Sequence, residues 1–438
     1  MKENKMAVMP IKKLVFNMSL PLMVSMLVQS MYNIVDGMFV AKIAENALTA
    51  TSIAYSAQML QIAVAVGTGV GVNVVVSRSL GAKQYDKVNL AAMTGLILTV
   101  LSSCIFVLWG IFGTKAFVSL FTTNQEIIRL STSYLRICQI FSTGIFLGTY
   151  YQRILQATGR TFSSMMAQIL GAVMNIVLDP LLIFYFHMGI QGAAIATVMG
   201  QWSAAILGYI LNKVQNKEVH FTWDTFYVDK GIIKKIYTIG FPTILVQAIG
   251  SVMMASMNMV LGTYSTMYVA LFGVYYKLQS FLFMPMNGLG QAVMPIISFN
   301  KGANHLKRIQ DTTKVALISG MCIGLVGTCI FMAFPQALLS MYSASQEMLD
   351  LGISVLRIIS ITFVFTSCTM IIGYIISGLG NAKINMISTF LRQLIVLIPC
   401  VYILGKDHLW YAFWVSEGIA FIYASIQYRK NMKSMIEF

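Results

Sequence analysis

Long apolar runs set the tightest limit on what this chain can fold into. Twelve of them can be read, at residues 14–41, 52–77, 89–112, 127–152, 162–187, 191–212, 236–262, 266–297, 312–335, 348–377, 384–404 and 409–428. A helix rises about 1.5 Å per residue, so about 20 apolar residues span the hydrocarbon core of a bilayer. Backbone groups in lipid must be satisfied within helices or a closed barrel, and these runs are too long for barrel strands. We therefore expect an all-α integral membrane protein with twelve transmembrane helices.

The charged residues support this class. Only 10% of the 438 residues are charged, whereas a soluble domain carries about 25%. The net charge of +15 would suggest a nucleic-acid partner in a soluble protein. With the N-terminus inside, however, most of the 30 lysines and arginines fall in cytoplasmic connections and helix ends. The positive-inside rule therefore predicts a multi-pass protein of the cell membrane with both termini in the cytoplasm, and it explains the charge without nucleic acid.

The two halves of the chain repeat at one constant offset, the separation of Pro21 from Pro242, which we call the repeat offset. Gln58 matches Gln279 at the same offset. The other pairs in this register are Tyr55 and Tyr276, Gly67 and Gly288, Gly69 and Gly290, Gly81 and Gly302, Arg136 and Arg357, and Gly159 and Gly380. One register kept over this length indicates an internal structural repeat.

Each half holds six apolar runs, an even number, so both halves enter the membrane from the same side. That arrangement is typical of a parallel repeat with a cavity between two lobes, which rock to give alternating access. We expect two pseudo-symmetric six-helix lobes, an N-lobe at residues 1–212 and a C-lobe at 236–438, joined by a cytoplasmic linker at 213–235. We expect the protein to be a monomer in the lipid bilayer.

Two acids interrupt the apolar runs of the N-lobe. Asp36 is the one charge in the stretch 14–40, and Asp179 ends a similar apolar stretch. A carboxylate at the centre of a bilayer costs about 2.5–3.5 kcal/mol on insertion scales, so an intramembrane acid is by default a functional residue. The alternative is that each acid makes a local hydrogen bond and fixes the packing of its helix.

Five residues are expected to meet at these acids. Tyr32 and Asp36 are four residues apart and share one helix face, and so do Asn175 and Asp179. Thr197 reaches a similar depth from the next apolar run. We predict that these five residues form a cation-coupling site in the N-lobe. Hard oxygen ligands suit Na⁺, and paired carboxylates suit a proton, so the sequence leaves H⁺ and Na⁺ open. A Na⁺ ion would be held by Asp36, Asn175, Asp179 and Thr197.

The C-lobe does not repeat this site. Met257 and Cys400 stand at the positions that match the two acids. The C-lobe has charges of its own at membrane depth, which are Lys277, Arg392 and Glu417. Arg392 and Glu417 each lie about nine residues into neighbouring antiparallel helices. We predict that they pair at mid-membrane, and we interpret the pair as structural.

Methionine is abundant, at 31 residues. Its flexible, polarizable side chain adapts to varied ligands, so methionines beside aromatic residues are suited to a promiscuous pocket. Our candidates for a substrate cavity are Gln29, Met257, Lys277 and Met284. The alternative for each methionine is ordinary packing or contact with lipid, and for Lys277 a bond to the backbone.

Enzyme motifs are absent from the sequence. It contains no H-E-x-x-H, Walker A or G-x-S-x-G pattern. The glycine-rich stretch 67–71 lies inside an apolar run, where close helix packing explains it better than phosphate binding. The six cysteines and four histidines show no metal-ligand spacing, and we interpret the cysteines as packing residues. We expect neither an enzyme nor a bound cofactor, and a coupling ion alone.

Several segments form a recognisable set, which is Pro21 followed by Asp36, residues 77–83 (SRSLGAK), 156–159 (QATG), 175–180 (NIVLDP), 285–292 (PMNGLGQA), Pro295 and 300–303 (NKGA). Taken together they resemble the multidrug and toxic compound extrusion (MATE) family over essentially the full length. The resemblance implies twelve helices in two six-helix lobes. It also implies efflux of cationic, lipophilic drugs driven by Na⁺ or H⁺. One branch of the family carries acids deep within helices seven and ten, and this chain has none there, since Asp350 stands at the start of the tenth run. It therefore resembles the MepA-like branch, in which the residues matching the five predicted here form the N-lobe site.

Together these features predict a secondary active multidrug efflux antiporter. It would export cationic lipophilic compounds in exchange for H⁺ or Na⁺ by alternating access. The alternative is a lipid-linked oligosaccharide flippase of related architecture, which needs basic residues for pyrophosphate. Lys277 and Arg392 keep that alternative open, whereas the acids of the N-lobe speak against it.

Overall fold

The computed structural model describes residues 3–43, 45–221, 227–342 and 346–436. Nearly all of these residues are helical, which confirms the predicted all-α class. The described chain divides into two compact units. The first unit contains residues 3–7 and Val24–Ile244, and the second contains Val8–Met23 and residues 245–436.

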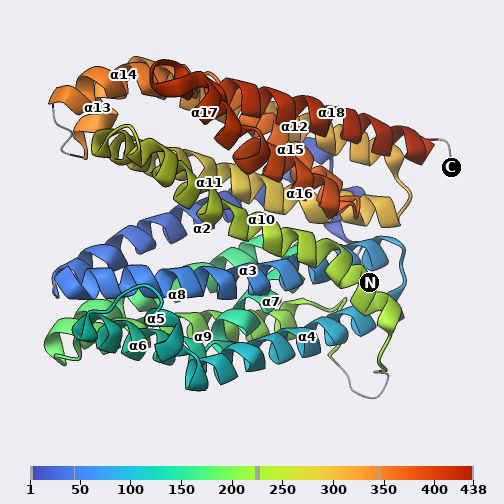
Figure 1. Cartoon of the computed structure of the whole chain (residues 1–438). Coiled ribbons are helices and arrows are strands. Elements are labelled where there is room, and N and C mark those ends of the chain that lie inside the picture. The colour runs from blue at the N-terminus through green and yellow to red at the C-terminus, as the bar shows by residue number, and fades with distance from the viewer. Residues whose placement is uncertain (1–2, 44, 222–226, 343–345, 437–438) are drawn as a thin grey trace. The chain divides into compact units, whose positions relative to one another are not determined.

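The first unit is a bundle of long helices (Figure 1). Its elements are α1 (Lys5–Val8), the second half of α2 (Ile11–Ala41), α3 (Glu45–Gly81), α4 (Tyr85–Phe112), α5 (Thr114–Val118), α6 (Gln125–Ile140), α7 (Thr143–Ala157), α8 (Thr161–Pro180), the π-helical turn η1 (Leu181–Tyr185), α9 (Gly189–Gln215) and the first half of α10 (Lys230–Gly262). α8 packs along α9, and α7 contacts both α3 and α9. These helices, in blue to green, lie side by side in Figure 1.

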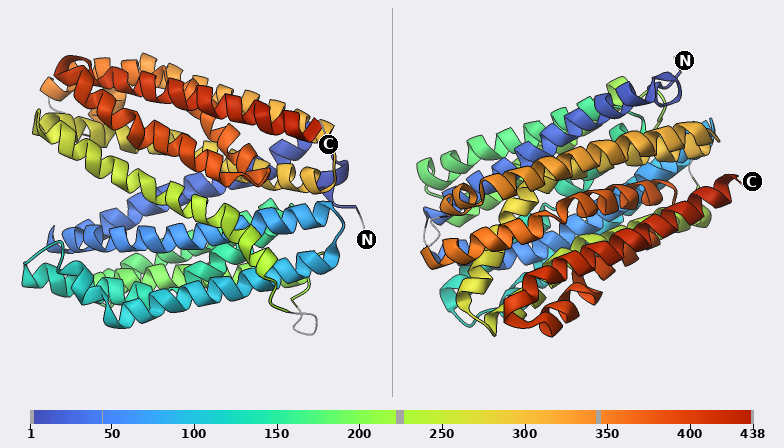
Figure 2. Two further views of the ribbon diagram at one scale, coloured as in Figure 1. Left: turned by 45° about the vertical axis from the view of Figure 1, so that its right-hand side comes forward. Right: turned by 90° about the horizontal axis from the view of Figure 1, so that it is seen from above.

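The second unit repeats this plan. Beyond the remaining halves of α2 and α10 it contains α11 (Thr266–Gly302), α12 (Leu306–Ala333), α13 (Pro335–Ser340), α14 (Gln346–Ser360), α15 (Phe363–Gly378), α16 (Ala382–Phe390), the π-helical turn η2 (Leu391–Ile395), α17 (Leu397–His408), the 3₁₀ turn η3 (Leu409–Tyr411) and α18 (Ala412–Ile436). α15 contacts α11, α12, α16 and α18, so it lies at the centre of the unit. Figure 2 shows these helices, in yellow to red, running alongside one another.

Each of the twelve predicted runs is a helix or a broken helix. Among the described residues nine helical segments are long and apolar enough to cross a membrane, and ten if α14 and α15, bent by 46°, count as one span. One of the nine, 382–435, contains two predicted runs, which separate at Gly405, where φ is +64°. The predicted run 127–152 corresponds to α6 and α7, which are interrupted at 141–142.

The helices confirm the repeat. α3 begins at Glu45 and α11 begins at Thr266, which are separated by the repeat offset. α4 and α12 show the same separation at both of their ends. The two units divide after Met23 and again after Ile244, once more at the repeat offset. The constant offset in the sequence therefore corresponds to a duplicated helical scaffold.

α2 and α10 are each shared between the two units, and each contains a proline just before the division, Pro21 in α2 and Pro242 in α10. A proline inside a helix removes one backbone hydrogen bond and weakens the helix at that point. The predicted lobe boundaries at 212 and 236 were placed from the repeat. The compact units are defined differently, and they divide inside α2 and inside α10. The predicted lobes stay a prediction.

Glycines let α3 approach the first half of α10 within the first unit. A Cβ on Gly71 would lie 2.2 Å from the Ile236 carbonyl oxygen, and one on Gly67 would lie 2.7 Å from the Gly240 carbonyl oxygen. Small residues at such crossings allow helix backbones to touch. The glycine-rich stretch 67–71 is therefore a packing surface, as the sequence indicated.

Candidate functional site

The two intramembrane acids of the first unit meet. Asp36 on α2 and Asp179 on α8 are joined by a side-chain hydrogen bond. Asp179 is fully buried and Asp36 is half-buried. A hydrogen bond between two carboxyl groups needs one proton, because an ionised carboxylate only accepts. Within the described residues, the Oδ1 atom of each acid has no hydrogen-bond partner.

Asn175 links this acid pair to Thr197. The two side chains lie 3.4 Å apart, from Asn175 Nδ2 to Thr197 Oγ1. With the Asn175 amide rotated, its nitrogen donates to Asp179 Oδ2 at 3.1 Å and its oxygen accepts from the Thr197 backbone N–H at 3.2 Å. The rotated assignment satisfies more partners, and oxygen and nitrogen of an amide are distinguished by such networks. Asn175 and Thr197 are both buried.

Close packing of α8 and α9 makes this contact possible. A Cβ on Gly200 would lie 2.6 Å from the Gly171 carbonyl oxygen and 3.3 Å from Asn175 Cβ. One turn beyond this crossing, Asn175 faces Thr197. α8 then ends at Pro180 and continues as the π-helical turn η1. Because Pro180 has no N–H, the backbone next to Asp179 departs from regular α-helix here.

Tyr32 and three residues that the sequence analysis did not single out complete the cluster. Tyr32 lies within electrostatic range of both acids. Tyr134 on α6 contacts the Thr197 side chain, and Cys138, one turn along α6, contacts Tyr134 and Gln58. The only sequence signal for any of these three was the match of Gln58 with Gln279 in the repeat. Tyr134 and Cys138 lie in an apolar run and resemble packing residues there.

The structure thus brings the five predicted cation-coupling residues together on α2, α8 and α9 of the first unit. They supply carboxylate, amide and hydroxyl oxygens around two acids. Such a set can share a proton between the acids, or release it and offer both carboxylates to a cation. Among the described residues no group of three or more His, Cys, Asp and Glu side chains could hold a metal ion. Hard oxygen ligands suit Na⁺, and paired carboxylates suit a proton.

The candidate cavity residues lie in different surroundings. Gln29 in the first unit accepts a hydrogen bond from Gln168 at 2.6 Å. In the second unit Met257 is fully buried, Met284 is partly buried, and the exposed Lys277 ammonium lies 5.8 Å from the centre of the Tyr342 ring. Their role in binding substrate stays a prediction.

The predicted ion pair of the second unit is confirmed. Arg392 in η2 lies 3.7 Å from Glu417 in α18, measured from Nη1 to Oε1. The Arg392 side chain is 13% exposed and the Glu417 side chain is 8% exposed. The prediction of a buried pair between neighbouring helices is therefore correct.

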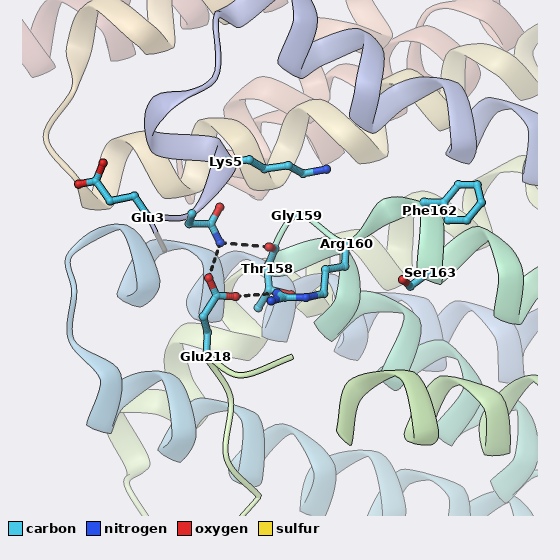
Figure 3. Close-up of a pocket in the computed structure, with 9 residues that line it drawn as sticks. Glu3, Lys5, Thr158, Gly159, Arg160, Phe162, Ser163 and Glu218 are labelled. Atoms are coloured by element: carbon cyan, nitrogen blue, oxygen red, sulfur yellow. Dashed lines mark hydrogen bonds and ion pairs between the residues drawn. The ribbon is translucent and has the colours of Figure 1, made fainter. Parts of the chain in front are cut away.

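A pocket of about 380 Å³ lies in the first unit at the N-terminal segment (Figure 3). Asn4 donates to the Thr158 carbonyl at 3.1 Å and to Glu218 at 2.8 Å. The other Glu218 oxygen binds Arg160 at 2.6 Å. Burial, and to a lesser extent the Arg160 guanidinium, lowers the pKa of the Lys5 ammonium. These bonds tie residues 3–7 to the first unit, away from the acid pair.

Comparison with known proteins adds to this geometry. A sequence model described as MatE matches residues 21–181 and again residues 242–403. The two matched segments begin at the two prolines that define the repeat offset, Pro21 and Pro242. They cover most of the chain and include both acids of the candidate site.

The chain is also similar to individual proteins. It is 24% identical to the multidrug export protein MepA of Staphylococcus haemolyticus, with 90% of this chain and 87% of that protein covered. A solved structure described as MATE in the straight conformation superposes with a TM-score of 0.94 at 24% identity, over the full length of both chains. A MOP superfamily transporter from Pyrococcus furiosus superposes with a TM-score of 0.93 at 24% identity, over 99% of each chain. These structures show that the fold is shared.

Proposed function

The chain belongs to the MatE family, and from that premise we propose that it is a secondary active antiporter which exports cationic lipophilic compounds in exchange for H⁺ or Na⁺. The observation that carries the proposal is the hydrogen-bonded pair of Asp36 and Asp179 inside membrane-spanning helices. The export of drugs is supported by the similarity to the MepA multidrug export protein.

The acid pair supplies the coupling step. Two carboxyl groups in contact do not readily ionise together, because like charges at short range repel. The pair therefore holds one proton, or exchanges it for a cation held by both carboxylates and by the oxygens of Asn175 and Thr197. Loading the pair from outside and discharging it inside biases the protein between its two access states. A tenfold gradient of the coupling ion supplies about 1.4 kcal/mol, which sustains about a tenfold concentration ratio of the exported cation in one-for-one exchange.

Both termini are cytoplasmic in this proposal. The basic connections of the first unit gather at one end of its bundle, where Ser77 donates to the Ala157 carbonyl at 3.1 Å and Arg160 binds Glu218. The opposite end holds the contact of Asn46 with Glu126 at 2.7 Å. The positive-inside rule assigns the basic end to the cytoplasm.

The test is dye efflux from proteoliposomes under a Na⁺ gradient and a pH gradient imposed separately. The gradient that drives efflux identifies the coupling ion. Asp36→Asn removes one carboxylate and is expected to abolish driven efflux, because an amide neither shares a proton with Asp179 nor carries charge to a cation. Asp350→Asn is the matched control, since Asp350 is an exposed acid of the second unit. Efflux by Asp36→Asn at the wild-type rate would remove the proposed mechanism.

A further inference from the structure

A pocket of about 470 Å³ lies in the second unit where α12 ends, which we call the α12 pocket. It is bordered by the end of α12, the short helix α13 and α14, and the latter two lie together, in orange, at one end of the unit in Figure 1. Its polar lining residues are Gln336, Ser340 and Arg357, and the rest of the lining is apolar. Because α12 is a candidate membrane span, the pocket lies at a boundary of the membrane.

Arg357 is the charged residue of this lining, and no ion pair among the described residues includes it. Its Nε donates to the Met332 carbonyl at 3.3 Å, in the last turn of α12. A guanidinium carries five N–H donors, so this bond leaves four on the two terminal nitrogens. Asp350, about two turns earlier on α14, bonds to Gln346 and forms no ion pair with Arg357. The guanidinium is therefore held in place by one bond and lacks an ion-pair partner within the described chain.

The position of Arg357 argues against an ordinary surface charge. It is the only charged residue in the stretch 351–382, which belongs to the bent span of α14 and α15, and its side chain is exposed. A charge in a membrane-spanning run is costly and is commonly paired. An arginine that only capped α12 would need a single donor. An exposed arginine at a membrane boundary meets lipid, so its counter-charge has to come from the bilayer.

The first unit keeps the same feature. Arg136 on α6 matches Arg357 at the repeat offset, is exposed, and is the only charged residue in the stretch 130–152. Gln336 is matched by Lys115, which is exposed on α5. The acids of the candidate coupling site, in contrast, are not repeated in the second unit. An exposed cation at this end of the bundle thus belongs to the duplicated scaffold.

An apolar face leads away from the α12 pocket. Val326 and Ile330 lie four residues apart on α12, and Phe334, which lines the pocket, follows four residues later. All three side chains are exposed. A polar pocket with one unpaired cation, joined to an apolar helix face, matches an amphiphile with an anionic head. The planar guanidinium fork is suited to two oxygens of a phosphate group.

We propose that the α12 pocket binds the phosphodiester of a phospholipid with one net negative charge, such as phosphatidylglycerol. The terminal nitrogens of Arg357 bind two phosphate oxygens, and Gln336 and Ser340 bond to the headgroup hydroxyls. The acyl chains lie along the exposed face of α12. A choline headgroup would bring a second cation to a pocket lined by no acid. The inference goes beyond the proposed export function and does not depend on the coupling ion.

Native mass spectrometry of the purified full-length protein in detergent measures the binding. All proteins carry Arg136→Gln, so that the matching arginine of the first unit does not contribute. Phosphatidylglycerol is expected to bind about tenfold more tightly than phosphatidylcholine, since a hydrogen-bonded charge contributes at least this factor. Glycerol 3-phosphate, which has the phosphate without acyl chains, should not displace it at equal concentration. Equal affinity for the two lipids, or displacement by glycerol 3-phosphate, would overturn the lipid site.

Arg357→Gln removes the cation and is expected to abolish the tenfold preference for phosphatidylglycerol. Arg429→Gln is the matched control, because Arg429 is an exposed arginine of α18 that does not line the pocket. An unchanged preference in Arg357→Gln would overturn the proposal. An equal loss in Arg429→Gln would do so too, because it would show only a general attraction between a basic protein and an anionic lipid.

Two changes at Gln336 test the site without altering Arg357, and they are made at an exposed position where folding is not at stake. Gln336→Lys introduces the residue type that the first unit has there and is expected to tighten phosphatidylglycerol binding several-fold. Gln336→Glu gives Arg357 an acid within the pocket and is expected to weaken it by a similar factor. Binding that is the same in both variants would show that the lipid lies elsewhere.

Discussion

The two units use one helical scaffold for two kinds of buried polar pair. In the first unit two acids, Asp36 and Asp179, share a hydrogen bond, and Asn175 extends it to Thr197. In the second unit a base and an acid, Arg392 and Glu417, face each other at 3.7 Å. An acid pair has a charge that depends on a bound proton or cation, whereas an acid–base pair is neutral without either. The first is suited to sensing an ion, and the second links η2 to α18 without a bound ion.

The difference arises at a few positions. Asp36 is matched in the repeat by Met257, which is fully buried, and Asp179 is matched by Cys400. The close crossing at Gly171 is matched by Arg392. The duplicated scaffold tolerates these exchanges because the backbone bonds lie within each helix, so side chains can change while the helices remain. The comparison teaches that the repeat specifies architecture and leaves chemistry to individual side chains.

Removing the acid pair should have the largest effect. Asp179→Asn is expected to reduce the dye ratio that a tenfold gradient of the coupling ion sustains in one-for-one exchange from about tenfold to about one, because efflux is no longer coupled to the ion. Asn175→Leu, which keeps both acids, is expected to give a partial loss. Steady-state dye ratios in proteoliposomes measure both. Equal losses in the two variants would show that Asn175 is as necessary as the acid and that the pair alone is not the coupling unit.

Placing an acid at the matching position of the second unit should destabilise the protein. Met257→Asp puts a carboxylate at a fully buried site, and the expected cost is about 2.5–3.5 kcal/mol. Met257→Leu, a swap of similar volume, is the control and should cost less than about 1.5 kcal/mol. Thermal unfolding of the purified proteins in detergent measures the difference. A Met257→Asp protein as stable as the control would mean that the second unit can accept an acid pair.

The helix crossing that aligns Asn175 should be sensitive to a single methyl group. Gly200→Ala places a Cβ 2.6 Å from the Gly171 carbonyl oxygen, and overpacking of this kind costs about 1–3 kcal/mol. Gly418→Ala in α18 is the control, because a Cβ there has nothing within 4 Å. Stability and driven efflux are measured together. Matching results for the two variants would show that the α8–α9 contact does not position the site.

The smallest effect concerns the N-terminal attachment of the first unit. Because the pKa of Lys5 is lowered in the folded protein, the detached segment binds more protons than the attached one. Attachment of residues 3–7 is therefore expected to strengthen as the pH rises through the lowered pKa toward the ordinary lysine value. Hydrogen exchange of amides 4–7, corrected for intrinsic rates, measures this. Lys5→Gln should remove the pH dependence, and a dependence of opposite sign in the wild type would contradict the prediction.

The sequence alone determined the architecture. Twelve apolar runs, the constant repeat offset and the match of Pro21 with Pro242 predict a duplicated helical membrane protein. These properties are local or periodic, because a span needs only enough consecutive apolar residues and a repeat needs only a register. Asp36 and Asp179 were also recognisable, since a charge inside an apolar run stands out against its neighbours.

The tertiary structure decided which side chains meet and how well they are satisfied. Tyr134 and Cys138 join the candidate site from α6, and nothing in their apolar surroundings marks them. The sequence predicted that Arg392 pairs with Glu417, but the distance of 3.7 Å and the unpartnered oxygen of Glu417 depend on how η2 and α18 pack. Contacts between helices far apart in the chain are set by the packing of whole surfaces, and a linear pattern gives only the depth and face of each residue.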